Sequence, residues 1–257
     1  MRALEEVIES SKADAFIMSG DISQRARTSE FMRGAEFLDF ASRHAQVLVV
    51  PGNHDVAWWW DPLGLGSHQA MFARYRRFIR DDLEPVLRLS GLTVVGLNSA
   101  QGVQRHTLTL RPRDLSVVGS LRASQWARAR DAFAAAPSGD LRVLVLHHNL
   151  LRGRLSNRWG LANRESGVQQ AASTGADLVL CGHDHEERVE RVENQGGSYV
   201  VASASTLTDR VRGGGPSSIN VIDAEPGAIT VTVMEWSAPA MRFETARVER
   251  FARGRQQ

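Results

Sequence analysis

Residues 47–55 read VLVVPGNHD, and this stretch decides the fold class. The run 47–50 is apolar and β-branched, as in the buried strands of α/β proteins. Pro51 and Gly52 then favour a turn, and three polar side chains follow it directly: Asn53, His54 and Asp55. Open α/β sheets place their ligands at the carboxyl ends of their strands, so this stretch predicts a sheet with a functional site at its edge.

Similar apolar runs alternate with helical patterns along the chain. Besides Gln46–Val50, buried strands are predicted at Ala15–Ser19, Leu92–Leu97, Leu141–His147, Ala176–Cys181 and Tyr199–Ala204. Helices are predicted at Met1–Lys12, Ser29–Arg43 (with Thr28 or Ser29 as N-cap), His68–Arg80, Ala123–Ala135 and Asn163–Thr174. After Ser198 two consecutive strands, Ser218–Ile222 and Ala228–Trp236, predict a second, antiparallel sheet packed on the first.

The bulk properties indicate one globular domain over residues 1–257, ending in a C-terminal tail at 237–257. Of the 257 residues 42% are hydrophobic and 23% charged, and the net charge is only +2, which argues against a strongly basic nucleic-acid surface. No apolar run approaches the roughly 18 residues of a membrane span, and the acidic start is not a signal peptide. The single cysteine, Cys181, fits a reducing cytosol, so we expect a cytoplasmic protein without membrane contact.

Polar clusters follow four of the predicted strands. They contain Asp21, the 53–55 tripeptide, the pair His147 and His148, and finally His183 and His185. Taken singly each is a weak signal, since a strand-end Asp is usually a turn residue and one of two adjacent histidines can be a core residue. Four such clusters at successive strand ends favour a set of metal ligands on one rim.

This set resembles the calcineurin-like metallophosphoesterases, whose pattern runs D-x-H, G-D, G-N-H-[DE], a later histidine and G-H-x-H. The matching positions are Gly20-Asp21, Gly52 to Asp55, His147-His148 and Gly182 to His185, and the likeness extends to about Trp236. The resemblance implies an α/β fold that forms a four-layer α/β/β/α sandwich. It also implies two divalent metal ions (Mn, Fe or Zn) at the strand ends.

The resemblance also implies a role for each matching residue. Asp21 would bridge both metals, Asn53, His147 and His183 would bind the second, and His185 the first; His147 is preferred to His148 as the ligand. His54 would stay off the metals and face the phosphate, with Asp55 hydrogen-bonded to it. A hydroxide activated by the two metals would then attack phosphorus.

The D-x-H motif has no counterpart before Gly20. A βαβ unit needs roughly 30 residues, and Met1–Lys12 already reads as its crossover helix, so the first strand would fall before Met1. The sequence leaves two explanations, a truncation, which we favour, or a natural short form with a half-built site. In either case the neighbours of the absent strand would have exposed edges, and the activity of the chain is in question.

We expect a small phosphoester as substrate, with phosphodiesters ahead of phosphomonoesters. One alternative is a catalytically impaired family member that acts as a binding scaffold; another is a nuclease, although no nucleic-acid groove or added domain is visible. Trp58-Trp59-Trp60 could stack a flat leaving group or form a lid or an oligomer contact. Arg210 or Arg212 could grip a phosphate or form surface ion pairs. The sequence does not indicate an oligomeric state.

Overall fold

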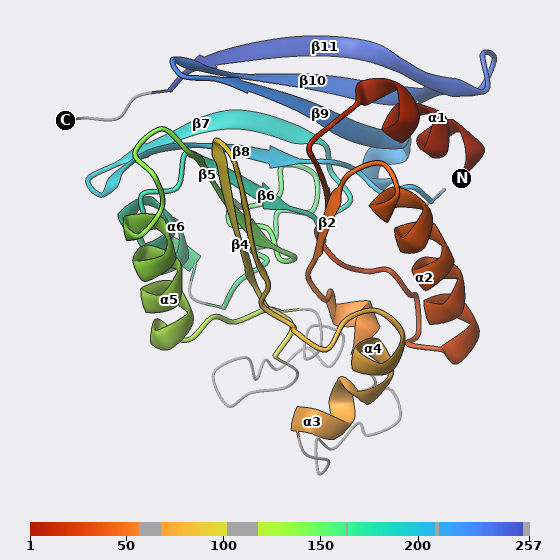
Figure 1. The fold of residues 1–257 in the computed structure, drawn as a ribbon, viewed down its shortest axis with the longest axis horizontal. Helices are drawn as coiled ribbons and strands as arrows, with labels where there is room; N and C mark the ends of the chain where they lie inside the picture. Colours follow the sequence, from red (N-terminus) through yellow and green to blue (C-terminus); the bar gives the residue numbers. More distant parts are fainter. Residues whose placement is uncertain (57–67, 102–117, 163, 209–210, 254–257) are drawn as a thin grey trace.

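The computed structural model describes residues 1–56, 68–101, 118–162, 164–208 and 211–253 (Figure 1). Its largest sheet has six strands in the order β3-β4-β5-β6-β8-β7. The four central strands run parallel to one another, and each edge strand is antiparallel to its neighbour. The strands are Val86–Leu89 (β3), Leu92–Leu97 (β4), Leu141–Leu146 (β5), Leu178–Cys181 (β6), Arg188–Asn194 (β7) and Gly197–Ser203 (β8).

Two smaller sheets accompany the large one. Ala15–Met18 (β1) and Gln46–Val49 (β2) pair in parallel. An antiparallel sheet in the order β11-β10-β9 contains Ser218–Glu225 (β9), Ala228–Ser237 (β10) and Arg242–Ala252 (β11). Within the described residues β1 pairs only with β2, and all four of its residues are half-buried. One edge of β1 therefore has no strand beside it in this part of the chain.

The helices complete a four-layer arrangement. They are Arg2–Ser11 (α1), Thr28–Ser42 (α2), His68–Met71 (α3), Ala73–Phe78 (α4), Ala123–Ala134 (α5) and Arg164–Ser173 (α6). On one face of the large sheet, Trp126 and Phe133 of α5 share a core with Leu146. On the other face, Val143 shares a core with Val231 of β10.

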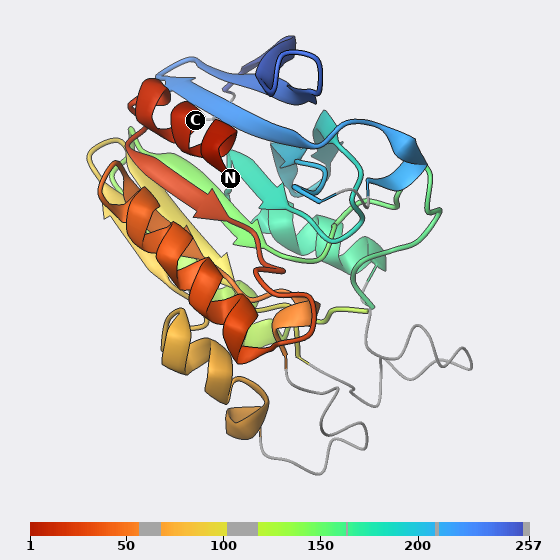
Figure 2. The ribbon, with the colours of Figure 1, turned by 90° about the vertical axis from the view of Figure 1, so that its right-hand side faces the viewer.

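The fourth layer consists of α1 and α2, which cover β1 and β2 (Figure 2). Leu4 and Ile8 of α1 share a core with Phe37 of α2 and Val47 of β2. The predicted α/β/β/α sandwich is therefore confirmed. None of the helices in the described part of the chain is long and apolar enough to cross a membrane.

Three strands were absent from the sequence prediction: β3, β7 and β11. The stretch expected as a C-terminal tail contains β11, which pairs with β10 along its whole length, so the tail prediction is wrong for Arg242–Ala252. The helix expected at His68–Arg80 is divided into α3 and α4. At the start of α2 the backbone amide of Arg27 donates to the Glu30 carboxylate at 3.1 Å, so Arg27 and not Thr28 or Ser29 is the N-cap.

Candidate metal centre

Asp21 and Asn53 lie on two turns that follow β1 and β2. The first turn uses positive φ angles, 100° at Gly20 and 56° at Asp21. A Cβ at position 20 would lie 2.6 Å from the backbone nitrogen of Gly52, so only glycine allows the two turns to come this close. The contact brings the Asp21 carboxylate to the turn that carries Asn53, and the Asp21 Oδ1 accepts the backbone amide of His54 at 2.9 Å.

Two histidines reach the same point from the large sheet. His147 follows β5 and His183 follows β6, and the backbone amide of Gly182 donates to the His147 carbonyl at 2.9 Å. His183 also has a positive φ of 73°. The carboxyl ends of four strands, β1, β2, β5 and β6, therefore bring one side chain each to a common point, as the strand-end pattern predicts.

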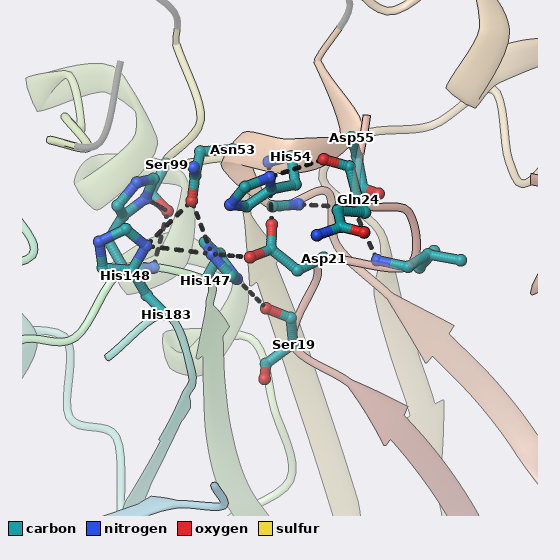
Figure 3. Close-up of polar contacts among 12 residues, drawn as sticks. Ser19, Asp21, Gln24, Asn53, His54, Asp55, Ser99, His147, His148 and His183 are labelled. Carbon is teal, nitrogen blue, oxygen red and sulfur yellow. Dashed lines mark hydrogen bonds and ion pairs between the residues drawn. The ribbon is translucent and has the colours of Figure 1, made fainter. Parts of the chain in front are cut away.

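Four metal-binding atoms meet there, as Figure 3 shows. His147 Nε2 lies 3.1 Å from Asn53 Oδ1 and 3.3 Å from Asp21 Oδ2. His183 Nδ1 lies 2.9 Å from Asn53 Oδ1 and 3.3 Å from His147 Nε2. We call these four residues the ligand cluster: Asp21, Asn53, His147 and His183.

The protonation of His147 shows that this point suits a cation. His147 Nδ1 lies 2.8 Å from the carbonyl oxygen of Ser19, so it carries a proton and donates it. In neutral imidazole Nε2 would then be an acceptor, yet it faces two other acceptors, Asn53 Oδ1 and Asp21 Oδ2. A positive charge, either a second proton on His147 or a metal ion, would make the contact with these two oxygens favourable.

The electrostatics of the cluster agree with this conclusion. Burial would raise the pKa of the Asp21 carboxyl, but the charges and hydrogen bonds of His147 and His54 together outweigh it and hold that pKa well below its usual range. Burial would lower the pKa of His147, but the Asp21 carboxylate outweighs it and raises that pKa. Burial and the charge on His147 lower the pKa of His183 to about 3, so His183 stays neutral and keeps a lone pair for a metal.

The donor set fits a borderline divalent metal. It consists of one carboxylate oxygen, one amide oxygen and two imidazole nitrogens, which together suit Mn²⁺, Fe²⁺ or Zn²⁺. In the described part of the chain no three His, Cys, Asp or Glu side chains alone form a metal-holding group. The Asn53 amide, which contacts both histidines, is therefore needed to complete the set.

His185, the fifth expected ligand, lies two residues after His183. Its φ is 56°, so both histidines of the G-H-x-H motif are in the left-handed region with Asp184 between them. His185 is half-buried, and its charge is one of the contributions, after burial and His147, that lower the pKa of His183. A role for His185 as a ligand of another metal stays a prediction.

The structure gives Asp55 different partners from the expected one. Its carboxylate accepts three backbone amides, from Gly52 at 2.9 Å, Ser23 at 2.8 Å and Ile22 at 3.2 Å. The His54 ring is instead oriented by the backbone, because its Nδ1 lies 2.8 Å from the carbonyl oxygen of Gln24. The expected Asp55–His54 hydrogen bond is therefore corrected: Asp55 ties the two turns together and acts on His54 only through them.

Several residues around the cluster were missed from the sequence. The contacts of Ser19 and Gln24 are made by backbone carbonyls, for which the sequence carries no signal. Ser99 contacts His148 and follows β4, so the strand-end rule could have found it. Trp58-Trp59-Trp60 and Arg210 lie outside the described residues, as does the side chain of Arg212.

Comparison with known protein families gives a match that includes the ligand cluster. The sequence model of the calcineurin-like phosphoesterase family matches residues 1–187. No curated protein matches the chain. The described ligand cluster lies wholly within the matched residues.

Solved structures are similar in fold at low identity. A purple acid phosphatase from yellow lupin (Lupinus luteus) seeds is 10% identical with a TM-score of 0.65, and the match covers 98% of this chain but 48% of that one. GAP50, the anchor in the inner membrane complex of Plasmodium, is 10% identical with a TM-score of 0.58, covering 100% and 84%. A single mutant of Vps29 from Entamoeba histolytica is 11% identical with a TM-score of 0.45, covering 98% and 89%.

At these identities the purple acid phosphatase and GAP50 structures show the fold alone. The family match is the stronger finding, because it spans well over half of the chain and includes each turn of the ligand cluster. The chain belongs to the calcineurin-like phosphoesterase family.

Proposed function

We propose that this protein is a metal-dependent hydrolase that acts on phosphodiesters. The observation that carries the proposal is the ligand cluster, in which four buried or half-buried donors from four strands meet, each within 3.3 Å of at least one of the others. A purely structural protein gains nothing from directing a carboxylate, an amide and two imidazoles at one another, because such groups are costly to bury without a cation. Their position at the strand ends is where open α/β sheets bind their ligands.

The chemistry follows from the charge of the substrate. Bound divalent metals would supply positive charge against the anionic phosphate and lower the pKa of water. Within the chain, Asp21, Asn53, His147 and His183 would hold one of these metals. Phosphodiesters stay as the preferred substrates, and phosphomonoesters as the second choice.

His54 would handle a proton beside the metals. Its Nδ1 is held against the Gln24 carbonyl, so the proton on Nδ1 is fixed and Nε2 is the nitrogen that can exchange a proton with a substrate. His54 is half-buried, which leaves it accessible from solvent. We assign it the stabilisation or protonation of the leaving oxygen.

The test is hydrolysis of bis-p-nitrophenyl phosphate and p-nitrophenyl phosphate after chelation and reloading with Mn²⁺. We expect the diester to be the better substrate. Asp21→Ala should lower kcat/KM by more than about 100-fold, beyond the effect typical of a residue outside the ligand shell. Asp39→Ala, which removes an exposed carboxylate on α2, is the matched control and should leave the rate unchanged.

Metal binding is measured in parallel by calorimetry. Hydrolysis that needs Mn²⁺ and Asp21 supports the proposal. A protein that binds Mn²⁺ through Asp21 but turns over neither ester contradicts it, and a binding scaffold then becomes the better description.

A further inference from the structure

Ser99 and His148 form a fully buried polar pair beside the ligand cluster. Ser99 is 0% exposed and His148 1%. The Ser99 Oγ lies 2.8 Å from His148 Nδ1, and it also accepts the backbone amide of His148 at 3.2 Å. The serine hydroxyl has one proton and two lone pairs, so while it accepts the amide it can either donate to Nδ1 or accept a proton from it. Ser99 thus fixes the position of His148 through two contacts, one with its ring and one with its backbone amide.

The His148 ring packs on both histidines of the cluster. Its centroid lies 4.5 Å from that of His183, with the planes tilted by 42°, and 5.0 Å from that of His147, with the planes nearly perpendicular. His147 and His183 also meet edge to face at 5.2 Å. Figure 3 shows Ser99 and His148 grouped with His183, on the opposite side of the cluster from Asp21. A shift of the His148 ring would therefore be transmitted to His183.

Gly119 closes the remaining side of this ring. A Cβ at position 119 would lie 2.3 Å from His148 Cγ and Nδ1, so the backbone is in direct contact with the imidazole. Gly119 itself is held in place, because its amide donates to the Gly160 carbonyl at 2.8 Å and its carbonyl accepts the Ala162 amide at 2.9 Å. The imidazole is confined by a serine, a glycine and the two histidines of the ligand cluster.

Packing alone does not account for a histidine here. The neighbouring buried positions Leu97, Leu146 and Leu150 are apolar, and an apolar side chain at 148 would avoid burying an imidazole and a hydroxyl. We infer that Ser99 and His148 are positioning residues that hold the His183 imidazole in the orientation needed for metal binding. This inference rests on the proposed function, since it takes His183 to be a ligand.

The experiment measures binding of Co²⁺ by the chelated protein, using titration calorimetry and the visible absorption of the bound ion. Ser99→Ala and His148→Phe should each weaken Co²⁺ binding about tenfold or more, as is typical when a group supporting a ligand is removed. Both should also change the absorption spectrum, because it reports the geometry of the ligands. Circular dichroism establishes that each variant is folded.

Two further variants distinguish an effect of the position of the His148 ring from the general effect of losing a buried hydroxyl group. Gly119→Ala leaves the polar pair intact but drives a methyl group into the His148 ring, and it should weaken Co²⁺ binding in the same way. Thr174→Val removes a buried hydroxyl just before β6, at the end of that strand away from His183. It should lower thermal stability without changing Co²⁺ affinity or the spectrum.

The outcomes distinguish this inference from the proposed function. If the native protein binds no Co²⁺, both are overturned. If it binds Co²⁺ and the variants at 99, 119 and 148 bind it with native affinity and spectrum, the positioning role alone is overturned. Weaker binding with an altered spectrum in those variants, but not in Thr174→Val, supports it.

Discussion

His147 is the residue at which a proton and a metal compete. Its pKa is raised because the Asp21 carboxylate outweighs the effect of burial, so it is protonated to a higher pH than an ordinary histidine. A metal that binds Nε2 must displace this proton. We therefore expect Mn²⁺ affinity to fall by about tenfold for each pH unit below that raised pKa. Calorimetry from pH 8 down to pH 6, in buffers of different ionisation enthalpy, should detect release of a proton; pH-independent affinity would exclude His147 as the titrating ligand.

Asp55 has a structural role that its sequence motif did not indicate. It is 1% exposed and is the acceptor for the amides of Ile22, Ser23 and Gly52. In Asp55→Ala these buried amides lose their acceptor, so we expect the free energy of unfolding to fall by about 3 kcal/mol or more. Urea unfolding in chelator, at pH 7, measures the change without metal. Asp39→Ala is the control and should stay within about 0.5 kcal/mol of the native protein.

The sequence predicted the metal-ligand residues better than it predicted the hydrogen-bond partners of the residues in the site. Asp21, Asn53, His147 and His183 could be identified because each follows an apolar strand, and parallel strands bring such positions together. The orientation of His54 could not, because its partner is the backbone carbonyl of a residue 30 positions earlier. Backbone partners have no side-chain signal and depend on how the turns meet.

At the scale of elements, strands were predictable where both faces are buried. β4 and β5 are nearly continuous apolar runs, and their observed bounds match or nearly match the predicted ones. β7 and β11 carry arginine and glutamate at half-buried and exposed positions and lie at sheet edges, so neither shows an apolar run. Their pairing is decided by the neighbouring strand, which the local sequence does not specify.

The end of β11 is anchored by a buried ion pair. Arg253 and Asp177 are 5% and 8% exposed, with 3.1 Å between Nη2 and Oδ2, and Arg253 also donates to the Gly139 carbonyl. Arg253→Ala leaves a buried carboxylate without this cation, so it should lower the free energy of unfolding by about 3–5 kcal/mol.

Arg250→Ala is the matched control for that prediction. Its partner is Glu225, and both side chains are more than 60% exposed. A surface pair of this kind contributes less than about 1 kcal/mol. Urea unfolding of the two variants side by side tests whether β11 is anchored; equal effects would contradict a special role for Arg253.

At the scale of the whole molecule, the ligand cluster joins parts that no strand ladder connects. Asp21 and Asn53 belong to the β1–β2 pair, whereas His147 and His183 belong to the six-stranded sheet. In the described part of the chain these two sheets share core packing but no backbone pairing. A metal held by all four residues would therefore cross-link these two sheets.

This cross-link predicts where a metal stabilises the protein. At a Mn²⁺ concentration about 100 times Kd, binding should add about 2.7 kcal/mol to the free energy of unfolding. If unfolding of the β1–β2 pair precedes that of the large sheet, hydrogen exchange should slow most in Ala15–Met18 and Gln46–Val49, because β1 is half-buried and pairs only with β2 among the described residues. Exchange in α5, which packs on the far face of the large sheet, should change least. Asp21→Ala should abolish both the added stability and the slowed exchange. If Mn²⁺ instead slows hydrogen exchange equally in α5 and β1, the metal acts on global unfolding and does not link the two sheets.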